Sequence, residues 1–472
     1  MRIGVLLEEL IDIAQITKTD FALSMNMTPS GLSKILTGKR LPFSKEKRMF
    51  SQQAAGYFSD AIYSSGCYLK FEKLFPVIYD FSSKYELEIF LTYAIKYALD
   101  IDFAAENNDY KDFPNRYAES FLGKKTILNM FCIILSDYIN KNDSLPLELY
   151  GTLPLCSQLY SDIFSRIKTT DSKRQKSISL NYFFDMSSFE ASCDECNNDI
   201  LSCITKMQQY CDLNLWMINK AIDSAFLLLK GQFLLLFSIQ MEGTPLMTLI
   251  SHKSYLNVFF NSLMKRNAKK ISYSKSEAVA AIEANPALVD QLIDRHIDVV
   301  YNFISIGYLI DKKDLEVIEG KEIIKSAILK LFQAIMVKET VFSVTVDAMM
   351  NFCATGKAIV PLLGAIDIKE DQRVPYLQRF DPYLDKEDPD KIKIINCDQP
   401  KVAIVCSRGL SIVYLIDSEY SSEKIHCFET DKINNILEKE MTGSNIKTLD
   451  FSPDLWDSYL DALSTNIHTP IY

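Results

Sequence analysis

Histidine is scarce in this chain of 472 residues, and its few copies are scattered. The four histidines are His252, His296, His426 and His468. None belongs to an H-E-x-x-H pair or to a recognisable nucleophile arrangement, the patterns that bring histidine to a zinc ion or to a reactive side chain. We therefore expect no catalytic residue, no metal site and no cofactor, and we predict that the protein is not an enzyme.

A long uninterrupted hydrophobic run is also missing. The most apolar stretch, 225–240, is broken by Lys230-Gly231-Gln232 and is too short to cross a membrane. The first residues predict an amphipathic helix containing Glu8, Glu9 and Asp12 rather than a signal peptide. Eleven cysteines spread along such a chain indicate reduced thiols. We therefore predict a cytoplasmic protein without a membrane partner.

Four of the cysteines lie within nineteen residues: Cys193, Cys196, Cys203 and Cys211. The first two form a C-x-x-C, which allows a zinc or redox site. No second C-x-x-C follows and no histidine lies nearby, whereas Cys196, Cys203 and Met207 share a helical face. Buried thiols that behave as small hydrophobic side chains explain the cluster better.

Two further patterns match ligand sites only in part. Gly123-Lys124-Lys125-Thr126 lacks the upstream glycine of a phosphate loop and has lysine in the Ser/Thr place, so we reject it. The acidic segment 381–390 holds four aspartates, Asp381, Asp385, Asp388 and Asp390, but no glycine at the bend that a calcium loop needs. We expect this segment to be a solvated surface linker.

The most informative segment, 16–40, predicts two short helices joined by a tight turn. Thr17 is a good N-cap for the first helix, and Asn26 stands where that helix stops, because Asn tolerates the left-handed conformation of a sharp C-cap. Thr28 caps the second helix, and Pro29 takes its first position, where a missing N–H costs nothing. The apolar faces comprise Phe21, Ala22 and Met25, then Leu32, Ile35 and Leu36. This pattern predicts a helix-turn-helix.

The segment resembles the DNA-binding domain of Cro and the phage repressors, the XRE-like type. The residues that carry the resemblance are Ile16, Thr17, Lys18, Phe21-Ala22, Asn26, Thr28, Leu32 and Thr37-Gly38-Lys39-Arg40. The chain departs from the family pattern at Asn26, where glycine is usual, at Gly31 inside the second helix, and at Thr37, where asparagine is usual. The resemblance covers about the first fifty residues.

The resemblance implies that the second helix lies in the major groove of double-stranded DNA. The implied base contacts come from Thr28, Pro29, Ser30, Ser33 and Lys34, with Lys34 the strongest candidate for guanine O6 and N7. The implied phosphate contacts come from Thr17, Lys18, Thr37, Lys39 and Arg40. The alternative is a helical pair that packs internally or docks a protein.

The charge distribution agrees with a DNA contact at one end of the chain. The whole chain has a net charge of −10, but residues 1–50 carry +3, from eight basic and five acidic side chains, and the remainder carries −13. A second basic cluster, Lys265, Arg266, Lys269 and Lys270, either extends the DNA footprint or is a solvated helix end.

The rest of the chain shows no fixed-period repeat and predicts two regions. Residues 52–217 are mostly helical by their apolar spacing, and the texture changes beyond residue 223. There we expect a hairpin of 233–239 and 246–250 with Gly243 at its turn, and helices at 256–265, 276–284 and 287–310. The expected strands are 341–346, 392–396, 402–406, 412–416 and 425–428, with Ser407-Arg408-Gly409 as a hairpin loop.

We therefore predict a mainly α fold with three domains. These are an N-terminal helix-turn-helix bundle (1–50), an α-helical middle for dimerisation and sensing (51–222), and an α+β C-terminal region of unknown role (223–472) with short antiparallel strands.

These features predict a sequence-specific transcriptional regulator of bacterial or phage type. A homodimer is expected, because one small head buries little surface and two heads on a palindrome roughly double the binding free energy. The body would sense an effector, either a small molecule or a peptide. The alternative is a phage-defence or toxin–antitoxin effector, in which the helix-turn-helix only targets or autoregulates an unrecognised activity in residues 51–472.

Overall fold

The fold is taken from a computed structural model of residues 1–472. The structure describes residues 1–78, 81–106, 118–141, 147–152, 178–185, 204–205, 207–208, 211–218, 224–240, 243–265, 268–305, 307–337, 339–383, 392–396, 402–416, 423–430, 434–436, 447–450 and 453–467. The chain divides into an N-terminal unit (Met1–Asn198, Lys206–Leu213 and Ile218–Ala268) and a C-terminal unit (Asp199–Thr205, Asn214–Met217 and Lys269–Tyr472).

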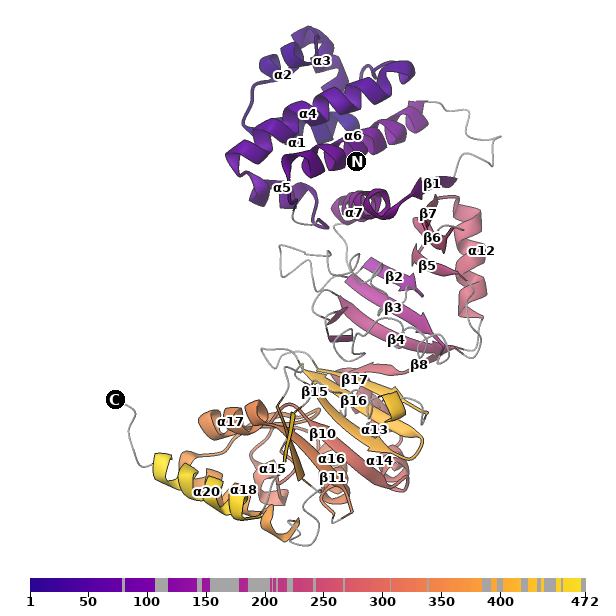
Figure 1. Ribbon diagram of the computed structural model, residues 1–472. Coiled ribbons are helices and arrows are strands. Elements are labelled where there is room, and N and C mark those ends of the chain that lie inside the picture. The colour runs from indigo at the N-terminus through magenta and orange to yellow at the C-terminus, as the bar shows by residue number, and fades with distance from the viewer. Residues whose placement is uncertain are drawn as a thin grey trace. The chain divides into compact units, whose positions relative to one another are not determined.

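The N-terminal unit begins with a bundle of helices (Figure 1). They are α1 (Ile3–Ala14), α2 (Lys18–Ser24), α3 (Pro29–Leu36), the 3₁₀ turn η1 (Ser44–Glu46), α4 (Lys47–Ser65), α5 (Tyr68–Leu74) and α6 (Lys84–Glu106). Aromatic side chains fill the space between α5 and α6, where Phe75 and Phe90 meet edge to face at 4.9 Å between ring centroids. Both rings are fully buried, so this contact contributes to the core that supports the smaller helices.

The first sheet follows the bundle. It has eight strands in the order β1-β7-β6-β5-β2-β3-β4-β8. Their bounds are β1 (Ala118–Leu122), β2 (Leu147–Gly151), β3 (Ile178–Phe184), β4 (Asp212–Ile218), β5 (Ala225–Leu229), β6 (Phe233–Ile239), β7 (Pro245–Ile250) and β8 (Ala268–Lys270). Two helices pack on it, α7 (Lys124–Lys141) through Tyr138 against Phe233, and α12 (Lys253–Met264) through Phe259 against Phe226.

The C-terminal unit is built on a second eight-stranded sheet, in the order β18-β14-β11-β10-β15-β16-β17-β9. Its strands are β9 (Ser272–Ser274), β10 (Ile297–Asn302), β11 (Val341–Thr345), β14 (Ile392–Asn396), β15 (Val402–Ser407), β16 (Leu410–Ile416), β17 (Glu423–Phe428) and β18 (Lys447–Asp450). A two-stranded sheet pairs β12 (Lys357–Val360) with β13 (Gly364–Asp367). The strands β10, β11 and β14 are mutually parallel, and the remaining pairs of the large sheet are antiparallel.

Helices connect the parallel strands and cover the sheet (Figure 1). They are α13 (Lys275–Ala284), α14 (Ala287–Ile293), α15 (Lys312–Glu316), α16 (Glu322–Ile335), α17 (Val346–Thr355), α18 (Glu370–Gln378), the 3₁₀ turn η3 (Asp381–Tyr383) and α20 (Pro453–Ile467). The amphipathic α16 lies between β10 and β11 in the chain and buries Ile328, Phe332 and Ile335 in the core of this unit. Such a long crossover is what a parallel pair requires, because a tight turn cannot join parallel strands.

The predicted fold class is therefore wrong. The chain is not mainly α, since two eight-stranded sheets and a two-stranded sheet lie within the described residues after residue 117. The expected helical middle contains β1, β2, β3 and β4, whose short apolar runs also fit a buried helix by their spacing. The expected antiparallel arrangement is also wrong for β10, β11 and β14. The helix expected at 287–310 ends at Ile293, and β10 occupies the rest of its apolar run.

Several local predictions are confirmed. The hairpin of β6 and β7 is antiparallel, with Gly243 at φ 73° in its turn. The hairpin of β15 and β16 forms around Gly409, at φ 69°. Left-handed glycine turns of this kind match the right-handed twist of the strands that they join. These elements are specified by residues next to one another in the chain.

Candidate nucleic-acid interface

The caps predicted for α2 and α3 are present. The Thr17 hydroxyl oxygen accepts a hydrogen bond from the backbone N–H of Asp20 at 3.1 Å, and the Thr28 hydroxyl oxygen accepts one from Gly31 at 3.1 Å. Pro29 occupies the first position of α3, and Asn26 adopts φ 53° between the helices. The turn is therefore held by local hydrogen bonds that the sequence itself encodes.

The apolar faces of α2 and α3 are buried against the helices around them. Phe21 is fully buried and its ring centroid lies 4.6 Å from that of Phe58 on α4. Leu32 and Ile35 of α3 are each 1% exposed. On α1, Gly4 approaches the C-terminal end of α3 so closely that an added Cβ would lie 2.2 Å from the carbonyl oxygen of Leu36. The pair of helices is thus fixed from two sides.

The opposite edge of α3 is open to solvent. All five candidate base-contacting residues are exposed: Thr28, Pro29, Ser30, Ser33 and Lys34. The side chains of Ser30, Ser33 and Lys34 have no hydrogen-bond or ion-pair partner among the described residues. The structure therefore brings these donors together on one short polar edge, where they are available to an external ligand.

The candidate phosphate contacts are exposed as well, but some already have partners. Lys18 pairs with Glu8 at 2.7 Å, and the Thr37 hydroxyl donates to the Ser33 carbonyl oxygen at 2.8 Å. The Thr17 hydroxyl is used by the cap and also donates to the Asp20 carboxylate at 2.6 Å. An exposed ion pair such as that of Lys18 contributes only about 0–1 kcal/mol, so this side chain can exchange its partner at low cost.

The last two phosphate candidates, Lys39 and Arg40, follow α3 in an exposed turn. The Arg40 guanidinium lies over the ring of Phe43, 5.3 Å from its centroid, and Phe43 itself is 62% exposed. Sequence reasoning did not select Lys45 and Arg48, which are also exposed and have no ion-pair partner among the described residues. The signal that could have found them is their position directly after the basic turn.

The structure describes only some of the other residues that the sequence singled out. Cys193, Cys196, Cys203, Arg266, Asp385, Asp388, Asp390 and His468 lie outside the described residues. Cys211 is buried and its thiol donates to the Met207 carbonyl oxygen. Lys269 pairs with Glu429, and Lys270 pairs with Glu277. The described residues contain no group of three or more potential metal ligands and no helix with the length and hydrophobicity to span a membrane.

A polar cluster is buried in the C-terminal unit. His426 on β17 and Ser272 on β9 are both 0% exposed, and the His426 Nδ1 lies 2.7 Å from the Ser272 hydroxyl oxygen. That oxygen also accepts a hydrogen bond from the Leu215 backbone at 2.6 Å. Burial, reinforced by the charge of Lys424, lowers the pKa of His426 to about 3. The imidazole is therefore neutral at pH 7, and the pair is closed off from substrate.

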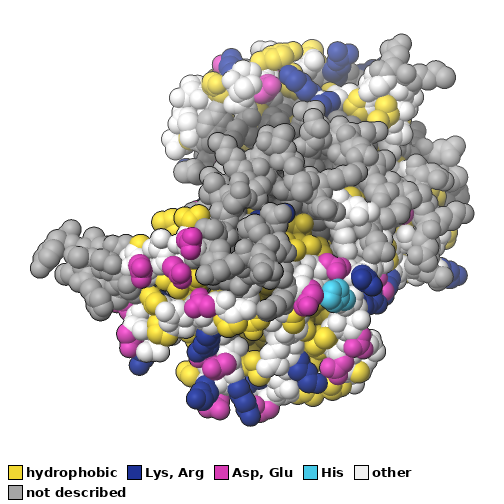
Figure 2. Space-filling model, turned by 60° about the horizontal axis from the view of Figure 1, so that its bottom comes forward, with side chains coloured by type: hydrophobic (Ala, Val, Ile, Leu, Met, Phe, Trp, Pro, Cys, Tyr) yellow, Lys and Arg dark blue, Asp and Glu magenta, His cyan; other side chains and the backbone are white. Residues whose placement is uncertain are grey.

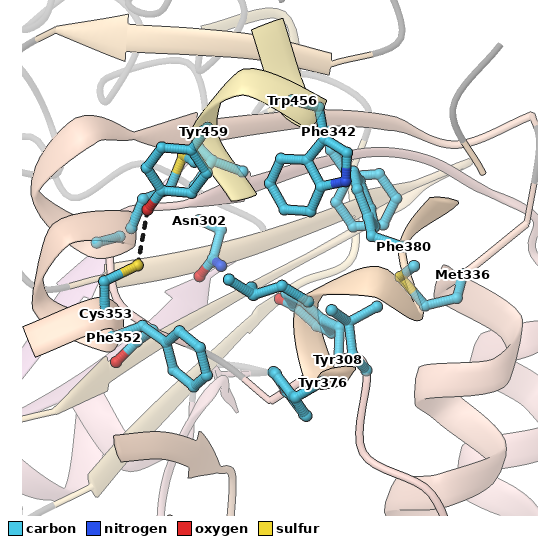
Figure 3. A pocket seen from close by; sticks show the side chains of 16 residues that line it. Asn302, Tyr308, Met336, Phe342, Phe352, Cys353, Tyr376, Phe380, Trp456 and Tyr459 are labelled. Carbon is cyan, nitrogen blue, oxygen red and sulfur yellow. Dashed lines mark hydrogen bonds between the residues drawn. The ribbon is translucent and has the colours of Figure 1, made fainter. Parts of the chain in front are cut away.

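The C-terminal unit also contains a cavity of about 120 Å³ that is partly open to solvent and that sequence reasoning did not locate (Figure 3). Asn302 stands at the carboxyl end of β10, and Val344, its neighbour on the parallel strand β11, also lines the cavity, which therefore reaches the carboxyl edge of the parallel strands. Tyr376 of α18 and Trp456 of α20 also line the cavity, although they lie far from β10 and β11 in the sequence. No local sequence pattern signals a site assembled from such distant segments.

Comparisons with known proteins leave the family open. No family model matches the chain, and no curated protein matches it. Among solved structures, one match is TrmBL2, described as an archaeal chromatin protein that shows a novel mode of DNA binding. The alignment has 12% identity and a TM-score of 0.21, and it covers 45% of this chain and 83% of that chain. A similarity of this size establishes neither a shared fold nor a shared function.

Proposed function

We propose that this protein is a sequence-specific regulator that binds double-stranded DNA through α2 and α3, with α3 in the major groove. The observation that carries the proposal is the division of α3 into two faces. Leu32 and Ile35 are buried, whereas Ser30, Ser33 and Lys34 are exposed and unpaired among the described residues. The exposed edge carries hydroxyl and ammonium donors, the groups that contact base edges in a major groove.

The charge around that edge supports a nucleic-acid partner. Four further cations, Lys39, Arg40, Lys45 and Arg48, are exposed near α3 in the chain and have no ion-pair partner among the described residues. Several cations of the C-terminal unit are neutralised in ion pairs: Lys321 pairs with Glu283, Lys330 pairs with Asp290 and Arg379 pairs with Asp314. On the face drawn in Figure 2, basic, acidic and hydrophobic side chains are likewise intermixed in its lower part. Unpaired cations supply the salt-dependent part of DNA affinity.

In this proposal the protein binds DNA as a homodimer. A single head of this size reads only a few base pairs, and the twofold symmetry of a dimer matches a palindromic site with half-sites about one DNA turn apart. The XRE-like resemblance of residues 16–40 agrees with this mode of binding. A membrane partner is not part of the proposal.

The test compares two lysines with distinct proposed roles. Sequences selected from a random duplex pool by the full-length protein define the preferred site. Lys34→Ala should then relax preference at one base pair, at a cost of about 1–3 kcal/mol for the preferred site. Lys39→Ala should weaken binding to all sequences and reduce the slope of log affinity against log salt by about 0.9, as expected for one lost phosphate contact.

Lys312→Ala is the matched control, because Lys312 is exposed in the C-terminal unit and has no ion-pair partner among the described residues. It should leave both affinity and salt dependence unchanged. An equal loss from Lys34→Ala and Lys39→Ala on every sequence would contradict the assigned roles. Failure of the wild-type protein to shift any duplex at low ionic strength would refute the proposal and favour protein docking.

A further inference from the structure

The cavity of the C-terminal unit has the size of a single small ring. Its volume is about 120 Å³. A cavity of about 150 Å³ in another protein holds a benzene molecule, and one water needs only about 10–15 Å³ by the same kind of measure. The space is therefore too large for one water and matches a single-ring molecule.

The walls of the cavity are aromatic and uncharged. The rings of Phe352 and Tyr376 lie 5.1 Å apart at a tilt of 34°, and those of Phe380 and Trp456 meet edge to face at 5.8 Å (Figure 3). No Asp, Glu, Lys, Arg or His is among the described residues that line it. Ring faces and edges of this kind favour a flat aromatic guest, since stacked and edge-to-face contacts are both available to it.

Two polar atoms in this wall have no partner among the described residues. The Asn302 Oδ1 and the Ser305 hydroxyl oxygen are buried without a hydrogen bond, and each residue is only 7% exposed. Other polar groups of the wall are satisfied: Trp456 Nε1 donates to Asp381 at 2.8 Å, and the Tyr459 hydroxyl lies 2.7 Å from the Cys353 sulfur. Buried polar groups are nearly always hydrogen-bonded, so these two atoms call for a partner inside the cavity, which is either water or the polar group of a ligand.

The position in the fold is one where ligands bind. Asn302 is the last residue of β10, and Ser305 follows it in the loop that leaves the sheet. On one side of β10 the sheet continues with the parallel strand β11, and on the other with the antiparallel β15. In open α/β sheets, ligands bind in the crevice outside the carboxyl ends of the parallel strands.

We propose that this cavity binds an uncharged, single-ring aromatic compound that carries one hydroxyl group, the chemistry of a phenol. Its O–H donates to Asn302 Oδ1, its oxygen accepts from the Ser305 hydroxyl, and its ring lies between the aromatic walls. Burial raises the pKa of the Cys353 thiol and of the Tyr376 hydroxyl, which indicates surroundings that disfavour charge. The site therefore selects the neutral phenol over a carboxylate of similar size. This inference does not rest on DNA binding.

Trp456 makes the cavity observable, because the chain has two tryptophans and the other is Trp216 on β4. In full-length protein carrying Trp216→Phe, Trp456 fluorescence is titrated with phenol, toluene and benzoate, with excitation at the red edge of tryptophan absorption. Phenol should change the emission saturably and bind at least tenfold more tightly than toluene, which lacks the donor. Benzoate should not bind.

Variants locate the binding. In the same background Asn302→Leu should weaken phenol binding at least tenfold and leave toluene binding within about twofold. Ala348→Leu, which places extra carbons in the cavity wall, should abolish both. Ser343→Ala is the control, since Ser343 is a buried serine of β11 outside the cavity lining, and it should change neither affinity. Thermal unfolding of each variant shows that the protein is folded.

The outcomes separate clearly. Absence of a saturable response to phenol overturns the proposal, as does equal binding of phenol and toluene or phenol binding that persists in Ala348→Leu. If Asn302→Leu or Ala348→Leu does not fold, Ser305→Ala, which removes only one oxygen, takes its place and should weaken phenol relative to toluene. DNA binding is measured by a different assay, so either proposal can fail alone.

Discussion

In the N-terminal helical bundle, Gly4 of α1 lies very close to the end of α3, and this contact allows a test of how α3 is held. An added Cβ on Gly4 would lie 2.2 Å from the Leu36 carbonyl oxygen, 2.9 Å from its carbonyl carbon and 3.1 Å from the Ile35 carbonyl oxygen. These atoms are backbone, so no side chain can turn aside. Gly4→Ala therefore forces α1 and α3 apart by about 1 Å.

The size of the effect follows from two opposing contributions. Replacing a glycine inside a helix by alanine gains about 1 kcal/mol of helix propensity. Overpacking costs about 1–3 kcal/mol, and the upper end applies here because backbone must move. We expect Gly4→Ala to lower the free energy of local unfolding by about 2 kcal/mol. Gly56 of α4 offers the matched control: its added Cβ would meet nothing closer than 3.6 Å, so Gly56→Ala should stabilise by about 1 kcal/mol.

Hydrogen exchange measures this in the full-length protein, because it reports the opening of individual segments. A loss of 2 kcal/mol should speed the exchange of the most protected α3 amides about 30-fold, since each 1.4 kcal/mol is a factor of ten. DNA affinity should fall in Gly4→Ala and stay unchanged in Gly56→Ala. Equal protection of α3 in both variants would show that the contact between α1 and α3 does not position the helix.

Two further predictions concern the C-terminal unit. Because the pKa of His426 is about 3 in the folded protein and about 6.5 when unfolded, only the unfolded state takes up this proton between those values. Stability should therefore fall as pH drops below about 6.5, by about 2 kcal/mol at pH 5, and His426→Gln should remove this slope in unfolding measured by urea. Gly356→Ala should destabilise by about 3 kcal/mol, because Gly356 has φ 69° and its added Cβ would lie 2.2 Å from the Ile368 carbonyl oxygen. Gly66→Ala is the control, because Gly66 is a helix C-cap with φ 64° and open space around it, and it should cost only about 1 kcal/mol. Hydrogen exchange measures both glycine variants, and equal losses from the two would contradict the steric argument.

The polar cluster around His426 could not be predicted from the sequence. His426 and Ser272 are separated by 154 positions in the chain, yet they are adjacent on paired strands. Sequence reasoning treats His426 only as a histidine outside any catalytic or metal pattern, and burial shows that it is structural. Only the pairing of β17 with β9 brings the two side chains together, and no local pattern encodes that pairing.

Which segments become strands, and how the strands pair, also depended on the tertiary structure. The run 297–302 has the apolar character of a buried helix or a buried strand, and the sequence analysis included it in a helix expected at 287–310. Pairing with β11 and β15 on both sides makes it a central strand. The cavity depends on the same step, because Asn302, Tyr376 and Trp456 come from three distant segments and their proximity exists only in the folded unit.

By itself, the sequence determined the local features that depend only on residues close together in the chain. The caps at Thr17 and Thr28, the left-handed Asn26 and the hairpin at Gly409 were each predicted from a few adjacent residues and were confirmed. Such features depend on hydrogen bonds and backbone angles within four or five positions. Other features depend on contacts between residues far apart in the chain, which form only when the whole unit packs. They are the choice of strand partners, the parallel direction of β10 and β11, and the burial of Asn302 Oδ1 without a hydrogen-bond partner among the described residues.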